Sequence, residues 1–244
     1  YNAYYTLRGG EIVACARKHF LPNFNVFDEV RLFKSADIAG PYALNNGARI
    51  GNPICEDAWY PDVCEAMVES GAEILVIPNG SPYFRDKFPI RMNNMVSRVI
   101  ENDVPVVYLN MVGGQDELVF EGDSIIVSSN GDVIQRALQF ETDMLISDLE
   151  IAAAGTQTTL SKGEQVTLIS NSAISTGKPV LSVESRKRLD PIPEVYSALV
   201  VSLRDYVQKN GFKSIALGLS GGIDSALVAA IAADAIGAKN VYGV

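Results

Sequence analysis

The sequence predicts an α/β protein: a layered sandwich of helices and strands, followed by a second α/β unit. Three observations support this fold class. In residues 1–150, strand-like apolar runs alternate with segments of helical spacing. Asn130-Gly131, a strong tight-turn signal, separates two β-rich runs within 120–138. Near the end of the chain an apolar run, a Gly-Gly turn and an Ala-rich segment follow one another.

The first unit contains several predicted elements in order. Apolar runs indicate strands at 11–16, 48–55, 72–78 and 105–112. Helical spacing indicates helices at 61–70, closed by Gly71, and at 91–103. Buried strands that alternate with helices and then join hairpins favour an α/β sandwich over a simple doubly wound sheet.

The second unit begins after a stretch of weak pattern. We interpret residues 156–190 as a linker between a first domain at 1–155 and a second at 191–244. Pro191 and Pro193 introduce an amphipathic helix at 194–211. A buried strand at 214–220, a glycine turn and an Ala-rich helix at 225–238 follow.

Composition excludes several functional classes. The 244 residues carry a net charge of −9, which argues against sequence-independent binding to nucleic acid. No apolar run is long enough to cross a bilayer. Three cysteines at irregular spacing fit neither a disulfide framework nor a zinc site, so we expect a reduced, cytoplasmic setting. The chain lacks an initiator Met and opens in mid-domain sequence, so we expect a fragment at both ends.

Cys55 is a candidate nucleophile because it is predicted at a strand-to-loop corner, where a side chain is exposed at the edge of a sheet. Lys18 follows another predicted strand and is a candidate cation for activating the thiol. A free cysteine is more often a small buried hydrophobe, and a lysine at a strand end is more often a solvated charge. We interpret Cys15 and Cys64 as packing residues, and His19 as an uncertain partner for the thiol.

The stretch SGGIDS at 220–225 follows a predicted strand and opens a helix. Main-chain N–H groups of such a turn form an anion site, which favours phosphate binding. The alternative is a plain Gly-Gly turn with an Asp-Ser helix cap. The sequence is neither a Walker loop nor a GxGxxG loop.

The motifs around Lys18 and Cys55 resemble those of the nitrilase superfamily. That resemblance implies an α-β-β-α sandwich and hydrolysis of an amide through a cysteine thioester, with Lys18 and a main-chain N–H stabilising the oxyanion. The family's general-base glutamate precedes the lysine, and no residue here is assigned to it, since Glu11 lies too close to Lys18. For glutamine binding, the resemblance implies Phe24, Glu56, Ser81 and Arg91.

LSGGIDS resembles the pyrophosphate loop of the ATP pyrophosphatase family, which implies the start of a doubly wound parallel sheet. The resemblance places ATP at Ser220, Gly221, Gly222, Asp224 and Ser225, and magnesium at Asp224. The order of the two units resembles that of glutamine-dependent NAD synthetases, which implies glutamine, ATP and deamido-NAD as substrates. We also expect a homo-oligomer that binds neither nucleic acid nor membrane.

Two alternatives remain open at this stage. The chain could combine a nitrilase-like amidase with an ATP pyrophosphatase of other specificity, such as a nucleobase- or tRNA-modifying enzyme. It could instead be a non-catalytic binding or scaffold module.

Overall fold

A seven-stranded mixed sheet forms the centre of the structure, a computed structural model that describes residues 1–44, 46–149, 151, 167–168, 177, 181 and 185–244. The strand order is β10-β9-β6-β5-β4-β3-β11. The three central strands β4, β5 and β6 run parallel, whereas β9 runs antiparallel to β6. The bounds are β3 Tyr42–Ala43, β4 Arg49–Gly51, β5 Ile74–Asn79, β6 Val106–Asn110, β9 Ile125–Val127, β10 Val133–Arg136 and β11 Thr167–Leu168.

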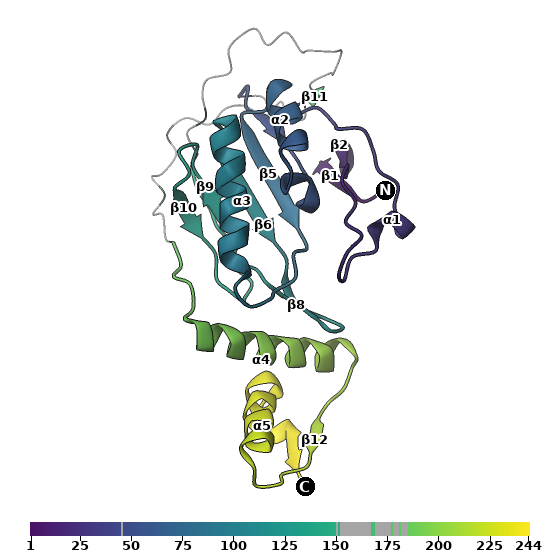
Figure 1. Ribbon diagram of the computed structural model, residues 1–244, viewed down its shortest axis with the longest axis vertical. Coiled ribbons are helices and arrows are strands. Elements are labelled where there is room, and N and C mark those ends of the chain that lie inside the picture. The colour runs from purple at the N-terminus through teal and green to yellow at the C-terminus, as the bar shows by residue number, and fades with distance from the viewer. Residues whose placement is uncertain (45, 150, 152–166, 169–176, 178–180, 182–184) are drawn as a thin grey trace.

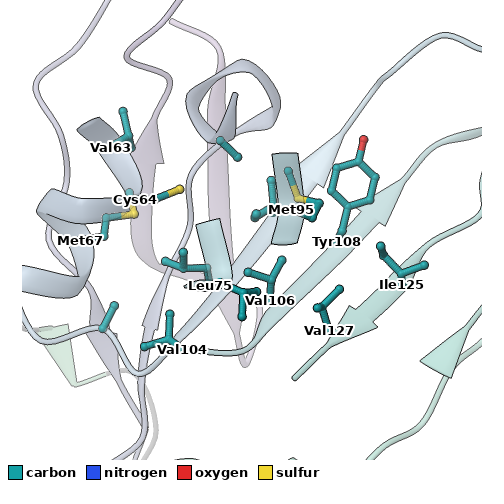
Figure 2. Close-up of a cluster of buried hydrophobic side chains, with 14 residues drawn as sticks. Val63, Cys64, Met67, Leu75, Met95, Val104, Val106, Tyr108, Ile125 and Val127 are labelled. Carbon is teal, nitrogen blue, oxygen red and sulfur yellow. The ribbon is translucent and has the colours of Figure 1, made fainter. Parts of the chain in front are cut away.

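Helices α2 (Pro61–Glu69) and α3 (Lys87–Asn102) cover one face of this sheet, as Figure 1 shows. They form the crossovers from β4 to β5 and from β5 to β6, which parallel strands require. Between helices and sheet lies one apolar cluster (Figure 2). Cys64 of α2 lies fully buried within it, as predicted for a packing residue. The strands contribute Leu75, Ile77 and Val106, each fully buried.

Several predicted element bounds in the first unit differ from the structure. The strand predicted at 48–55 ends at Gly51, because Pro53 has no N–H for a ladder hydrogen bond. Cys55 therefore does not end a strand but begins a short 3₁₀ helix, η1 (Cys55–Ala58). The run at 105–112 divides into β6 and a separate strand, β7 (Val112–Gln115). Helix α3 begins four residues before the predicted start, at Lys87.

One hairpin forms an edge of the sheet, and a second forms a separate two-stranded sheet. Strands β9 and β10 pair antiparallel around Asn130-Gly131, which confirms the predicted turn, and Gly131 has φ 88°. At the other side, β1 (Ala3–Arg8) pairs with β2 (Glu11–Arg17), of which the sequence predicted only the second. Strand β2 ends immediately before Lys18, as expected. A short helix, α1 (Glu29–Leu32), follows within the same flank.

Helix α4 (Pro191–Lys209) crosses below the sheet and packs on the hairpin of β7 and β8 (Leu118–Glu121) (Figure 1). The helix begins at Pro191, three residues before the predicted start, because proline suits the first helical position. The contact requires a glycine at position 114, since a Cβ there would lie 3.1 Å from the Cα of Ser202. Most of the predicted linker, 156–190, lies outside the described residues.

The C-terminal elements form a β-α-β unit next to α4. Strand β12 (Ile215–Leu217) pairs in parallel with β13 (Val241–Gly243), and α5 (Ile223–Ile236) and η2 (Ala238–Asn240) connect them. This confirms the predicted strand–turn–helix order. The expectation that β12 is buried is wrong, because its residues are half-buried or exposed. In the part of the chain that the structure describes, no helix is long and apolar enough to span a membrane.

Candidate active site

Lys18 lies fully enclosed where the chain leaves β2, with its side chain only 1% exposed. Its ammonium donates to both carboxylate oxygens of Glu29, at 2.8 and 2.9 Å. Glu29 is the first residue of α1, so the helix brings a carboxylate back to the lysine from eleven residues further along the chain. A buried ammonium needs such a partner, because an unpaired charge is costly to remove from water. Glu29 is not predicted as a site residue from the sequence.

Cys55 occupies an unusual main-chain conformation, with φ 50°. The left-handed region costs a residue with a side chain about 1–2 kcal/mol, and such strain concentrates at functional sites. Cys55, Lys18 and Glu29 together line a cavity of about 300 Å³. The turn therefore presents the thiol to the ion pair, although the corner is a 3₁₀ turn rather than a strand end.

The Cys55 thiol is shielded from water, and this burial raises its pKa above the usual value. Lys18 acts in the opposite direction and lowers the pKa, but it does not outweigh burial. The activation of the thiol by Lys18 stays a prediction, and the direction of its effect on the pKa supports it. Burial thus favours the protonated thiol, and because the thiolate is the nucleophile, a base has to accept the proton as the sulfur attacks.

A second buried ammonium, Lys87 at the start of α3, lies within electrostatic reach of Cys55 and Glu56. Its Nζ donates to the carbonyl oxygen of Pro82 at 2.5 Å, and it lies 5.0 Å from the centre of the Phe84 ring. Burial, reinforced by nearby Arg91, lowers the pKa of Lys87 to about 8. Sequence reasoning missed Lys87, because a lysine at a helix start is ordinarily a surface charge.

The four predicted glutamine-binding residues are not among those that line this cavity, although Glu56 and Ser81 directly follow lining residues in the chain. Glu56 is 7% exposed, and burial raises the pKa of its carboxyl against the opposing effect of Lys18. Ser81 is buried beside the cavity, and its N–H donates to the Asn110 side chain at 3.0 Å. Phe24 is 48% exposed and packs edge-on against Phe27, which lines the cavity. The binding roles of these residues stay predictions.

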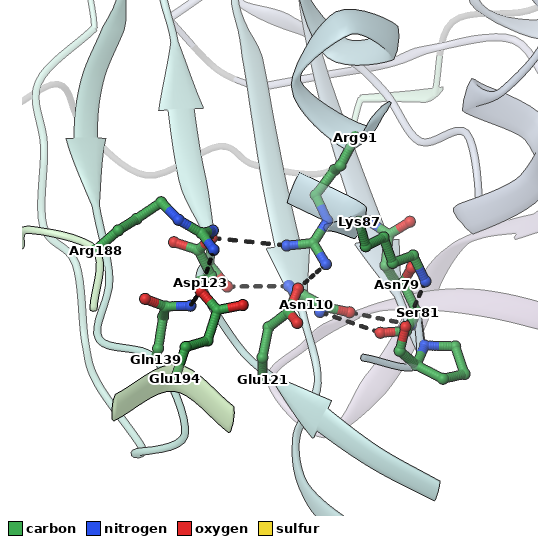
Figure 3. A network of polar contacts seen from close by, with 12 residues as sticks. Asn79, Ser81, Lys87, Arg91, Asn110, Glu121, Asp123, Gln139, Arg188 and Glu194 are labelled. Atoms are coloured by element: carbon green, nitrogen blue, oxygen red, sulfur yellow. Dashed lines mark hydrogen bonds and ion pairs between the residues drawn. The ribbon is translucent and has the colours of Figure 1, made fainter. Parts of the chain in front are cut away.

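Arg91 belongs to a buried network of charges behind the site (Figure 3). Its guanidinium pairs with Glu121 and lies 3.8 Å from Asp123. Asp123 also pairs with Arg188, whose second nitrogen lies 2.5 Å from Glu194 in α4. Because two carboxylates already engage Arg91, the geometry favours a supporting role for it. Its assignment to glutamine stays a prediction.

The phosphate-loop residues lie at the other end of the chain, between β12 and α5. Gly221 has φ 82°, which favours glycine, and Gly222 precedes the first turn of α5. The Ser225 hydroxyl lies 3.2 Å from the Ser220 hydroxyl and donates to the Gly222 carbonyl at 3.1 Å. These residues and Asp224 lie in an exposed loop and helix start, so the main-chain donors face solvent. Within the described ranges, no group of three or more potential metal ligands occurs.

A comparison with protein families agrees with this division. Residues 1–158, which contain Lys18, Glu29 and Cys55, match the carbon-nitrogen hydrolase family model. This chain belongs to the carbon-nitrogen hydrolase family. Residues 195–244, which contain the glycine loop, match the NAD synthase model.

Curated relatives match this chain over nearly its whole length. The chain is 43% identical over 242 residues to the glutamine-dependent NAD(+) synthetase of Rhodobacter capsulatus, covering 99% of the chain and 40% of that protein. The synthetase of Aquifex aeolicus is 42% identical over 253 residues, covering 100% of the chain and 44% of that protein. The chain thus spans about two-fifths of the length of these relatives.

A solved structure is similar throughout the chain. The glutamine-dependent NAD+ synthetase from Acinetobacter baumannii, in complex with adenosine diphosphate, has a TM-score of 0.82 and 32% sequence identity. The match covers 100% of this chain and 41% of that one. The nitrilase-like fold and the start of the second α/β unit, both expected from the sequence, are therefore confirmed.

Proposed function

We propose that this chain carries the glutamine-hydrolysing site and the ATP loop of a glutamine-dependent NAD synthetase. The observation that carries this proposal is the cavity in which the left-handed Cys55 turn meets the buried Lys18–Glu29 pair. The glycine loop at 220–225 supplies a phosphate-binding element in the same polypeptide. We propose the domain division 1–155, 156–190 and 191–244, which the two matched ranges support.

The charges around the cavity suit a free amino acid that ends in an amide. Glu56 and Lys87 carry opposite charges and both act electrostatically on Cys55, so we assign them to the ammonium and the carboxylate of glutamine. Lys18, by contrast, is already paired with Glu29 through two short hydrogen bonds. Ser81 and Phe24 would complete the pocket. Arg91 would support its wall through Glu121.

Hydrolysis proceeds in two steps through Cys55. The sulfur attacks the carboxamide carbon while the thiol proton passes to a base and then to the departing nitrogen, so that a thioester forms and ammonia leaves. Water then attacks the thioester, which releases glutamate and restores the thiol. Lys18 and a main-chain N–H at the start of η1 stabilise the oxyanion of both tetrahedral intermediates, a contribution of about 3–4 kcal/mol per donor.

Ammonia is used where ATP activates a carboxylate. Ser220, Gly221, Gly222 and Ser225 would hold the phosphates of ATP through main-chain N–H and hydroxyl groups. Asp224 is an exposed carboxylate in the first turn of α5 and fits a magnesium ion that also binds phosphate oxygens, since magnesium needs few protein ligands there. The nicotinate carboxylate of deamido-NAD becomes an acyl adenylate with loss of pyrophosphate. Ammonia then displaces AMP and yields the amide of NAD. We propose that the protein assembles as a homo-oligomer.

Two variants of the full-length protein test this proposal. Cys55→Ala is expected to reduce glutamine-dependent NAD formation by about 10³-fold or more while leaving ammonia-dependent formation unchanged. Asp224→Ala is expected to reduce formation from both nitrogen sources. Cys15→Ala, a thiol on β2 that does not line the cavity, serves as the matched control and should retain both activities.

The outcomes separate the proposal from its alternatives. Equal loss of both activities in a folded Cys55→Ala protein would contradict ammonia transfer from this site. Glutamine hydrolysis without formation of NAD in the unmodified protein would instead favour an ATP pyrophosphatase of other specificity. Absence of a covalent adduct of diazo-norleucine on Cys55, seen by intact mass, would favour a non-catalytic module.

A further inference from the structure

The two reactive side chains of the amide site both lie outside long regular elements. Lys18 follows the last residue of β2, and Cys55 opens a 3₁₀ helix of four residues after an irregular segment. No strand ladder connects the loop that carries Lys18 with the loop that carries Cys55, because β2 pairs with β1 and not with the central sheet. The distance between ammonium and thiol must therefore be fixed by side-chain contacts between the loops.

Asp57 makes these contacts. One carboxylate oxygen, Oδ1, accepts from the main-chain N–H of His19 at 3.1 Å and of Phe20 at 2.7 Å. The other, Oδ2, accepts from the N–H of Ile54 at 3.0 Å. His19 directly follows Lys18, and Ile54 directly precedes Cys55. A single side chain, only 2% exposed, thus binds the neighbours of both reactive residues.

The contact requires a carboxylate. Three donors converge on two oxygens, and an amide would offer one oxygen and turn an NH₂ group toward a main-chain N–H. The bond to Ile54 also closes the turn that holds Cys55 in its left-handed conformation. The bonds to His19 and Phe20 hold the lysine loop against that turn. Two further hydrogen bonds hold the other side of the Lys18 loop. The Ser35 hydroxyl donates to the His19 carbonyl at 2.6 Å, and the Ala36 N–H donates to the Lys18 carbonyl at 3.2 Å.

We propose that Asp57 is a positioning residue that sets the separation of the Lys18 ammonium from the Cys55 thiol. The inference rests on the roles assigned to Lys18 and Cys55 in the proposed function. Lys18 favours the thiolate, whereas Glu56 and Glu29 disfavour it. Loss of the Asp57 hydrogen bonds lets the Lys18 ammonium move away, so that Lys87, which also lies within electrostatic reach of Cys55, is the cation left to oppose the two carboxylates. The thiol then loses its main electrostatic support, and alkylation of Cys55 requires a higher pH.

The test is the pH profile of Cys55 alkylation by iodoacetamide in the full-length protein, followed by peptide mass spectrometry. Asp57→Asn is expected to raise the midpoint of the profile by about half to one pH unit, so that alkylation at a fixed pH below the midpoint is about 3- to 10-fold slower. Asp62→Asn, an exposed acid in the first turn of α2, is the matched control and should leave the profile unchanged.

A double-mutant cycle separates positioning from mere stability. In a Lys18→Met background the ammonium is absent, so Asp57→Asn should no longer move the midpoint. The same shift with and without Lys18, or no shift in the single variant, overturns the proposal. Asp57→Glu keeps both oxygens and should give a smaller shift of the same sign if the Asn variant does not fold. If neither Asp57→Asn nor Asp57→Glu folds, Asp57 is needed for stability, and this outcome also overturns the proposal. Because alkylation needs neither glutamine nor ATP, failure of the proposed function would be seen separately, in turnover.

Discussion

The amide site and the phosphate loop are built in opposite ways. The amide site joins Lys18, Glu29, Cys55 and Lys87, which come from four separate segments of the chain; the two lysines are buried, and Glu29 and Cys55 are partly buried. The phosphate loop consists of six consecutive residues, and its recorded side-chain bonds run between those same residues. The first therefore depends on how distant segments pack, and the second on local main-chain conformation. Substitutions should reveal the same contrast.

The largest effect is expected where the amide site loses its internal ion pair. Lys18→Met should reduce glutamine-dependent turnover by about 10²–10³-fold, because the oxyanion loses its charged donor. Glu29→Gln should reduce glutamine-dependent turnover by about 10- to 100-fold, because Lys18 loses its partner and its position. Breaking such an ion pair is strongly unfavourable. Steady-state rates with glutamine and with ammonia measure both, and ammonia-dependent rates should not change. An active Glu29→Gln protein with wild-type kcat would show that the lysine needs no partner.

An intermediate effect is expected at Lys87, where substitution should separate glutamine binding from the chemical step within the amide site. Lys87→Met should raise the KM for glutamine by about 10- to 100-fold, because a charged hydrogen bond contributes roughly 1.5–3 kcal/mol. The kcat should change much less, since Lys87 is assigned to the carboxylate and not to the reacting amide. Lys34→Met, at an exposed lysine, is the control. A fall in kcat with unchanged KM would move Lys87 into the chemical step.

The smallest effect is expected in the phosphate loop, and it should depend on conformation alone. Gly221→Ala forces a side chain into a left-handed conformation, which costs about 1–2 kcal/mol, or about 5- to 30-fold in apparent affinity for ATP. Gly218→Ala is the matched control, because a Cβ there meets nothing within 4 Å and its φ is not positive. The KM for ATP with ammonia as nitrogen source measures both. Equal effects at 218 and 221 would contradict a conformational role for Gly221.

The same contrast explains what the sequence could predict. The strand–glycine turn–helix at 214–237 was readable because its signals are adjacent in the chain. Lys18 and Cys55 were found through motifs, but Glu29 and Lys87 were not, because nothing local distinguishes a buried charge from a surface one. The strand predicted to reach Cys55 stops at Gly51, and the 3₁₀ turn that replaces it depends on the carboxylate of Asp57. The bonds from His19 and Phe20 to the same carboxylate span 38 and 37 residues, and contacts of that range leave no periodic signal in the sequence.

Gly114 has a further consequence for how the two matched regions stay aligned. Its N–H donates to Asp205 at 2.7 Å, and its carbonyl accepts from Lys209. Asp205 and Lys209 are four residues apart, so one face of α4 holds both polar groups of one residue, with an anion on one side and a cation on the other. A shift of the helix by a single turn, about 5.4 Å, would bring the wrong charge to one of the two groups and leave the other without its partner. The position of α4 along the β7–β8 hairpin is therefore set by these charges as well as by the close packing at Gly114.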